Sequence, residues 1–376
     1  MSEEEQPAKG TSRSPGPATS GTNEDAERDE VLGKIDAEHL PHRLPANNWR
    51  STALRVVVSL AFLGVLFWRL PDVSVDDVLP ELSTAVAGWV VAAIVIHMLA
   101  YLLQTLRWST VSATLGIHLP FRRMVSHLLA GEFVSNALPT SFGGDVVRVV
   151  RQGQDSGDFA DAFAATALER LTGWLVLPLL SAVALIASPD LLQLGAATTV
   201  AIVTNVVTIL ALVALLWAAG HERLAGRLIG SSGWRRYLAA VHLGVLAFRH
   251  HPRRVLEVLA AGLGFQFMQC LSVVAAARAL QIPEVTLLAA MAFFPPTAVL
   301  QNVPLALGGL GVREAAFVLF FGALGVADAS AIALGLLVYL VFVAASLAGA
   351  PSFVTGRKAR GGSPASARPD VPQSRQ

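Results

Sequence analysis

Long apolar stretches follow one another along the chain between residues 51 and 351. A transmembrane helix needs about 20 mostly apolar residues, because the hydrocarbon core of a bilayer is ~30 Å thick. Uninterrupted stretches of this kind cover residues 51–70, 84–106, 160–187, 191–219, 255–280 and 329–351. The pattern therefore predicts an all-α polytopic membrane protein with six full transmembrane helices.

Two further apolar stretches, 121–153 and 285–325, are broken in their centres. The breaks are Asn136-Ala-Leu-Pro139 with Gly143-Gly144-Asp145, and Asn302-Val-Pro304 with Gly308-Gly309-Leu-Gly311. Proline and paired glycines interrupt helices, and the freed backbone groups are costly in lipid unless protein or water satisfies them. We therefore predict two re-entrant helical hairpins. The alternative, two ordinary spans in each stretch, gives up to ten spans.

The order of polar residues in the first broken stretch recurs in the second, about 165 residues later. The two halves, 51–187 and 191–351, each hold two apolar spans, one broken stretch and one further span. Each half crosses the membrane an odd number of times, so the halves must lie in opposite orientations. This predicts an inverted repeat, the arrangement in which broken helices form the binding site of secondary transporters.

The ends of the chain differ from its middle. Residues 1–50 and 352–376 are polar and rich in proline, glycine and serine, so both are predicted to be disordered tails flanking the membrane domain at 51–351. The connections 107–123 and 220–254 carry many arginines, whereas 71–83 has no lysine or arginine. Because positive residues stay on the cytoplasmic side, we expect both termini in the cytoplasm and a location in the inner (cytoplasmic) cell membrane.

Composition narrows the function classes. Hydrophobic residues make up 53% of the chain and charged residues 15%, against roughly 25% charged in soluble domains. The net charge of +1 argues against a nucleic-acid partner. The single cysteine, Cys270, excludes a disulfide framework within the chain. The sequence has no DxD, HxxxH or Walker A pattern, so we predict no catalytic residue, metal or cofactor.

Arginines beside the glycine pairs are the first candidate binding residues. An arginine at membrane depth costs ~2.5–3.5 kcal/mol and normally faces a cavity or a partner. Glycine lets backbone N–H groups approach a ligand, and a helix N-terminus favours an anion. The predicted phosphate cradle comprises Gly143, Gly144, Arg148, Gly308, Gly309 and Arg313, with Asn136 and Asn302 capping the incoming half-helices. The alternative is structural, with Arg148 pairing with Asp145 and Arg313 with Glu314.

Further charged residues lie inside predicted helices. Glu169 and Arg170 lie within the predicted span 160–187. Arg170 is predicted to reach a lipid headgroup, and Glu169 is predicted to pair with Arg148 or to carry a proton. The alternative is an ion pair that only joins two spans. Glu132 is a further buried acid and a second proton candidate.

Uncharged polar residues form two stripes. His97, Tyr101 and Gln104 share one helix face, and Gln266 with Gln269 forms a shorter stripe in the equivalent span. These stripes either line a groove for a headgroup or hydrogen-bond between helices.

Three stretches resemble the signatures of a known family. They are Asn136-Ala-Leu-Pro-Thr-Ser-Phe-Gly-Gly-Asp-Val-Val-Arg148, Glu169-Arg170 and Gly308-Gly-Leu-Gly-Val-Arg-Glu314. Together they resemble the lysylphosphatidylglycerol synthase transmembrane region, or flippase-like domain, over roughly residues 50–350. The resemblance implies movement of a lipid between leaflets. Other relatives are associated with different lipids, including polyprenyl-linked sugars and hopanoids. The best-known members also carry an aminoacyl-transferase domain, and without one before Gln376 we expect no aminoacyl transfer.

These observations lead to one expected function and two alternatives. We expect a flippase-like transporter that moves an anionic phospholipid or a polyprenyl-phosphate-linked lipid and is not an enzyme. The alternatives are a secondary transporter of a small solute or ion, and a membrane-embedded lipid-modifying enzyme. The expected partners are membrane lipids and a separately encoded lipid-modifying or glycosyl transferase.

Overall fold

The computed structural model describes residues 83–137, 143–220, 235–302 and 311–355, and every regular element in these ranges is a helix. The helices are α4 (Thr84–Thr114), α5 (Phe121–Ala137), α6 (Gly143–Ser156), α7 (Phe159–Ala187), α8 (Ala196–Gly220), α10 (Arg235–His250), α11 (Pro252–Ala279), α12 (Leu287–Gln301), α13 (Val312–Gly322), α14 (Asp328–Ser346) and α15 (Ala350–Thr355). Short 3-10 turns occur at η2 (Pro189–Gln193) and η5 (Leu347–Gly349). The predicted all-α class is confirmed for the described ranges.

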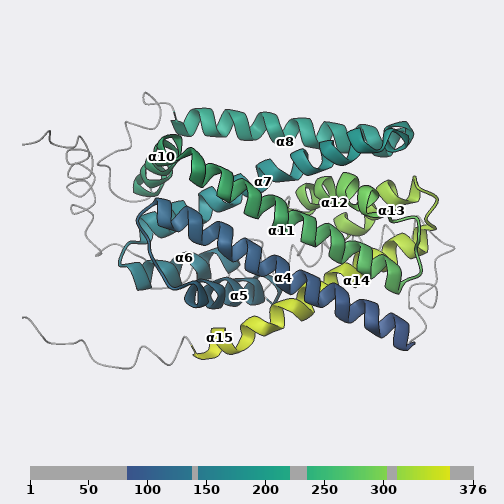
Figure 1. Cartoon of the computed structure of the whole chain (residues 1–376), viewed down its shortest axis with the longest axis horizontal. Coiled ribbons are helices and arrows are strands. Elements are labelled where there is room, and N and C mark those ends of the chain that lie inside the picture. Colours follow the sequence, from purple (N-terminus) through teal and green to yellow (C-terminus); the bar gives the residue numbers. More distant parts are fainter. Residues whose placement is uncertain (1–82, 138–142, 221–234, 303–310, 356–376) are drawn as a thin grey trace, which may run out of the picture.

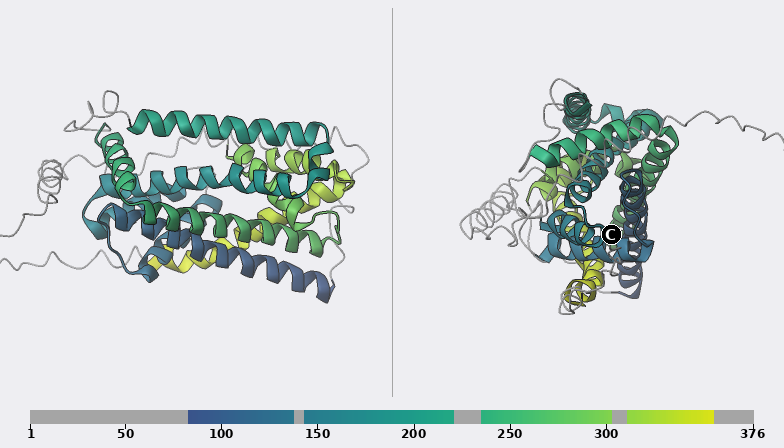
Figure 2. Two further views of the ribbon diagram at one scale, coloured as in Figure 1. Left: turned by 45° about the horizontal axis from the view of Figure 1, so that its top comes forward. Right: turned by 90° about the vertical axis from the view of Figure 1, so that its left-hand side faces the viewer.

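Five of the described helices are long and apolar enough to cross a membrane. They are Thr84–Thr114, Phe159–Ala187, Ala196–Ala219, Pro252–Ala279 and Asp328–Phe353. The helices α4, α7, α8 and α11 run lengthwise along the molecule (Figure 1) and stay side by side when it is turned (Figure 2). Large apolar side chains such as Ile186 and Leu210 point outward from them, as expected where lipid rather than water surrounds the bundle. These helices match five predicted spans, and the sixth, 51–70, lies outside the described residues.

Each broken stretch forms a pair of short helices. α5 packs against α6 and α12 against α13, and all four are shorter than the ~20 residues of a typical span. The two pairs lie at opposite ends of the long axis (Figure 1). The breaks themselves, at residues 138–142 and 303–310, lie outside the described residues, and so does the predicted glycine pair Gly308-Gly309.

The helix boundaries correct two details of the predicted layout. α4 continues to Thr114, so Arg107 lies inside a helix and is buried, instead of opening the connection 107–123. At the other end, α15 makes residues 352–355 of the predicted C-terminal tail helical. The remainder of both tails lies outside the described residues. Arg107 therefore does not mark the cytoplasmic side, and the predicted orientation rests on the remaining arginines of the connections.

Small residues let α5 and α6 approach closely. A Cβ atom on Gly144 would overlap the Gly131 carbonyl and the Ser135 hydroxyl. A Cβ atom on Gly131 would in turn lie 2.8 Å from Cγ of Arg148. The first hairpin therefore needs glycine at both positions, and their absent side chains leave the space in which Arg148 packs.

Candidate functional site

A polar cavity of about 220 Å³ lies between α4, α5, α7, α11, α12 and α14. Its charged lining residues are Arg107, Glu132, Glu169 and Arg170. Its amide lining residues are Gln104, Asn136, Gln266, Gln269, Gln301 and Asn302. Polar and ionised groups are expensive at membrane depth and normally face a functional cavity there. The cavity is therefore the candidate site.

The two predicted polar stripes meet at this cavity. His97, Tyr101 and Gln104 line it from α4, and Gln266 and Gln269 line it from α11. α4 and α11 pack against each other along their length, which brings stripes more than 160 residues apart in the sequence onto one wall.

The first helix of each short-helix pair ends at the cavity. Asn136 lies in the last turn of α5 and Asn302 caps the end of α12. The Asn136 amide donates to the Glu132 carbonyl at 3.0 Å, and the Asn302 amide donates to the Ala298 carbonyl at 2.7 Å. Each amide bonds back to a carbonyl four residues earlier in its own helix. Asn302 is the residue at which α12 ends, whereas Asn136 lies within α5, and the capping role of both asparagines stays a prediction.

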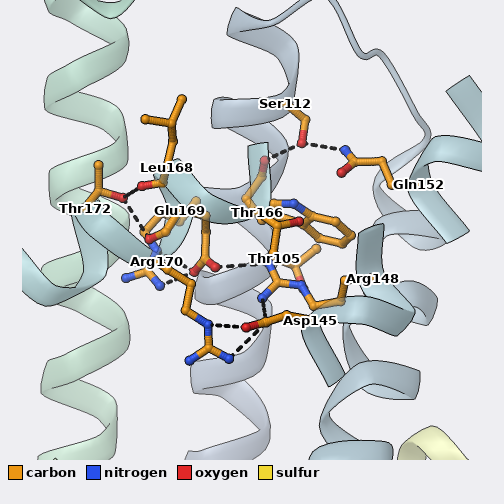
Figure 3. A network of polar contacts seen from close by, with 12 residues as sticks. Thr105, Ser112, Asp145, Arg148, Gln152, Thr166, Leu168, Glu169, Arg170 and Thr172 are labelled. Carbon is orange, nitrogen blue, oxygen red and sulfur yellow. Dashed lines mark hydrogen bonds and ion pairs between the residues drawn. The ribbon is translucent and has the colours of Figure 1, made fainter. Parts of the chain in front are cut away.

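Glu169 is held by arginines from two other helices (Figure 3). Its Oε1 accepts a 2.9 Å hydrogen bond from Nε of Arg107 on α4 and also contacts Nη2 of that residue. Its Oε2 accepts a 3.1 Å bond from Nη2 of Arg148 on α6. The side chain of Glu169 is only 1% exposed. Charge-assisted bonds from two other helices to one carboxylate fix the relative positions of α4, α6 and α7.

Asp145 extends this network toward the cavity. Its Oδ2 lies 2.7 Å from Nε of Arg170, and its Oδ1 accepts a 2.9 Å bond from Nη2 of the same residue (Figure 3). Its Oδ1 also lies 3.4 Å from Nη1 of Arg148. The five side chains, Arg107, Asp145, Arg148, Glu169 and Arg170, form one continuous ionic cluster. Arg170 is its most open member, with a side chain that is 36% exposed.

Aromatic rings and glycines complete the surroundings of the ionic cluster. The Arg148 guanidinium lies 4.3 Å from the centre of the Trp108 ring, a cation–π distance. A Cβ atom on Gly173 of α7 would lie 2.9 Å from both Nη atoms of Arg107. Glycine at this position therefore gives Arg107 the room to reach Glu169.

The second hairpin carries its own ion pair. Nη2 of Arg313 lies 2.7 Å from Oε1 of Glu314, and Oε2 of Glu314 accepts a 2.5 Å bond from the backbone N–H of Gly311. The Arg313 guanidinium lies 4.9 Å from the centre of the Tyr339 ring. Gly335 of α14 faces Glu314, and a Cβ atom there would lie 3.2 Å from its Cγ. Both charges are sealed from solvent.

The structure separates the predicted site residues into two groups. Glu132, Asn136, Glu169, Arg170 and Asn302 line the cavity. Arg148, Arg313, Asp145, Glu314, Gly143 and Gly144 lie outside its lining. Arg148 and Arg313 both have the carboxylate partners of the structural alternative, and their binding of a phosphate stays a prediction.

Sequence reasoning missed one cavity residue of consequence. Arg107 lines the cavity and anchors the ionic cluster, although it was predicted to stand at the end of a span, in the connection 107–123. A signal was present, because Arg107 follows Gln104 by three residues and so continues the polar stripe of α4. Among the described residues, no group of three His, Cys, Asp or Glu side chains is placed to hold a metal ion.

Membrane-length apolar helices packed around a polar cavity define a multi-pass α-helical membrane protein. More narrowly, the chain belongs to the lysylphosphatidylglycerol synthase TM region family, which it matches over residues 53–349. The resemblance inferred from the glycine-arginine motifs is thereby confirmed. No curated protein and no solved structure gives a match.

Proposed function

We propose that this protein moves an anionic phospholipid or a polyprenyl-phosphate-linked lipid between the leaflets of the cell membrane. One observation carries the proposal. Two pairs of short helices lie at opposite ends of the bundle (Figure 1), and the first helix of each pair ends at the same polar cavity. Discontinuous helices that meet at a central polar site are the hallmark of secondary transporters. Membership of a lipid-related membrane family directs the choice of substrate toward a lipid.

The helix contacts support an inverted repeat with re-entrant hairpins. α4 and α11, the equivalent spans of the two halves, pack against each other. The first leg of each hairpin packs against the last span of the other half, α5 on α14 and α12 on α7. Such reciprocal contacts are expected when two halves are related by a two-fold axis in the membrane plane. In this arrangement, both ends of the membrane domain lie on the same side, and the arginine-rich connections favour the cytoplasm as that side.

The cavity has the chemistry of a headgroup site. Its volume of about 220 Å³ is below the ~300–1,000 Å³ of typical drug-sized ligand pockets, so it accepts a headgroup while the acyl or polyprenyl chains stay in the surrounding lipid. Arg107 and Arg170 supply donors for a phosphate, and the amides around them supply hydrogen bonds for hydroxyl groups. The protein then acts without catalysis and exchanges lipid with a separately encoded lipid-modifying or glycosyl transferase.

The test is leaflet exchange in vesicles. Purified full-length protein is reconstituted in phosphatidylcholine vesicles that contain trace fluorescent phosphatidylglycerol or a fluorescent polyprenyl phosphate. Dithionite then bleaches the dye that reaches the outer leaflet. We expect continued bleaching of the anionic probes and slow bleaching of a zwitterionic phosphatidylcholine probe.

The result that overturns the proposal is equally concrete. If every lipid probe stays as protected as in protein-free vesicles, this protein does not move lipids of these classes. Uptake of a small solute into the same vesicles would then support the alternative of a small-solute transporter.

A further inference from the structure

The charges around the cavity do not balance within the ionic cluster. Its cations are Arg107, Arg148 and Arg170, and its anions are Asp145 and Glu169. Both carboxylates are each shared by two arginines. One positive charge is therefore left over, inside a bundle whose low dielectric makes an uncompensated charge expensive.

Glu132 of α5 is the group that can remove this excess. It lines the same cavity and is half-buried. Its electrostatic neighbours are Arg148, Arg170, Asp145 and Glu169. Among the described residues, no hydrogen bond or ion pair to its carboxylate is found, in contrast to Asp145 and Glu169. When Glu132 is ionised the cluster and Glu132 together are neutral, and when it is protonated they carry one positive charge.

The elements packed against α5 contribute further ionisable groups, which have surroundings of their own. α4 presents His97 and Tyr101 at the cavity, with Arg107 in the ionic cluster. α6 presents Asp145 and Arg148, while its Asp155 pairs with Arg123 and His127 of α5 and its Arg151 donates to the Ser352 and Phe353 carbonyls. α7 contributes Glu169 and Arg170. η5 and α15 contain no charged residue, while the ionisable residues of α14 are Asp328 in its first turn and Tyr339 beside Arg313.

We infer that Glu132 takes up a proton when a headgroup with one negative charge enters the cavity, so that anionic lipid and proton bind together. The inference rests on the proposed function and names its coupling ion. In the empty cavity the ionised Glu132 compensates the spare arginine. A phosphodiester headgroup brings its own negative charge and takes over that role, so the carboxylate then faces an added like charge and binds a proton. By linkage, the proton and the headgroup raise each other's affinity.

The other acids of the cluster are unsuited to this role. Glu169 is 1% exposed and bonded to Arg107 and Arg148, so protonating it would leave both arginines without their shared partner. Asp145 is held by two bonds from Arg170. Glu132 is open to the cavity and can exchange a proton without breaking an ion pair.

Calorimetry of the full-length protein in detergent tests the inference directly. Dioctanoylphosphatidylglycerol is titrated in buffers of different ionisation enthalpy, which gives the number of protons taken up with each lipid. We expect about one proton per lipid at pH values where Glu132 is ionised, and an affinity that falls by up to about tenfold per pH unit as pH rises. Dioctanoylphosphatidylcholine, which carries no net charge, should bind without proton uptake.

The matched variants are Glu132→Gln and Glu257→Gln. Glutamine at position 132 mimics the protonated acid, so phosphatidylglycerol should bind with no proton uptake and with an affinity independent of pH. Glu257 is exposed, pairs with Arg254 and lies outside the cavity, so Glu257→Gln should behave as the unmodified protein.

Each outcome decides the inference. Phosphatidylglycerol binding without proton uptake by the unmodified protein overturns it and leaves the lipid-transport proposal standing. Unchanged proton uptake by Glu132→Gln also overturns it, and if that variant misfolds, the measurement on the unmodified protein decides alone. If no phosphatidylglycerol binds at any pH, the inference fails, and the vesicle exchange assay separately decides the transport proposal.

Discussion

Arg107 of α4 and Glu169 of α7 form a buried ion pair at the wall of the polar cavity, although 62 residues separate them in the chain. The pair belongs to the ionic cluster that includes Arg148 of α6. Arg148 connects the cluster to the pair of short helices α5 and α6. The same charged residues therefore hold the helices together and line the candidate site. Each variant must be tested for both stability and transport.

Removing the charge of Glu169 should destabilise the protein. Glu169→Gln leaves Arg107 and Arg148 without their shared carboxylate in a buried position. Breaking a buried pair in this way costs about 3–5 kcal/mol. Unfolding by titration with a denaturing detergent measures the loss. The exposed pair Arg254–Glu257 provides the control, since Glu257→Gln should cost at most about 1 kcal/mol. Equal stability of both variants would contradict the structural role of Glu169.

A methyl group at Gly173 should displace Arg107. Gly173→Ala places a Cβ atom 2.9 Å from both Nη atoms of Arg107, and such overpacking costs about 1–3 kcal/mol. Gly88→Ala in α4 is the matched control, because its Cβ atom meets nothing within 4 Å. We expect slower leaflet exchange and lower stability for Gly173→Ala only. If both variants match the unmodified protein, the space beside Arg107 is not critical.

Arg170 should affect transport more than folding. Its side chain is 36% exposed and lines the cavity, and Asp145 keeps Arg148 as a second partner when Arg170 is removed. Loss of a hydrogen bond to a charged group costs about 1.5–3 kcal/mol, so Arg170→Ala should slow exchange of fluorescent phosphatidylglycerol by about ten- to a hundredfold. Arg170→Lys should restore only part of the rate, because lysine keeps the charge but lacks the planar fork. A normal rate in Arg170→Ala would exclude this arginine from headgroup binding.

A paired substitution separates the two interpretations of Arg313. Arg313→Ala leaves Glu314 buried without its cation and should cost about 3–5 kcal/mol. Replacing the pair together, by Arg313→Met with Glu314→Leu, should recover most of this stability because buried pairs often tolerate apolar replacement. If the folded double variant exchanges anionic lipid at the normal rate, Arg313 is structural. If it folds but does not transport, the predicted phosphate role gains support.

The predicted orientation can be tested by labelling single cysteines. Asp190 lies in η2, after the end of α7, and Arg253 lies in the first turn of α11. With cytoplasmic termini, a cysteine at Asp190 should react with an impermeant maleimide on intact cells, and a cysteine at Arg253 only after lysis. The natural Cys270 is buried and serves as the unreactive background. Labelling of both positions on intact cells would contradict the proposed topology.

The sequence by itself determined the helical class, the presence of the five described spans and the two short-helix pairs. Hydrophobic length and helix-breaking residues are local properties, so they can be read without knowing which helices become neighbours. The stripes His97, Tyr101, Gln104 and Gln266, Gln269 were also visible, because helical spacing alone places each set on one face. Their meeting at one cavity was not determined locally, because it depends on the packing of α4 against α11.

The tertiary structure decided the partners of the buried charges. From the sequence, Glu169 was predicted either to pair with Arg148 or to carry a proton. The packing of α4, α6 and α7 gives it both Arg148 and Arg107 as partners. Gly173 was not singled out in the sequence. Because it has no Cβ atom, it leaves the space that the Arg107 guanidinium occupies. The physical reason is that a buried charge is stable only with a partner within hydrogen-bond distance. That distance is set by close packing between helices that are remote in the chain, which no local pattern encodes.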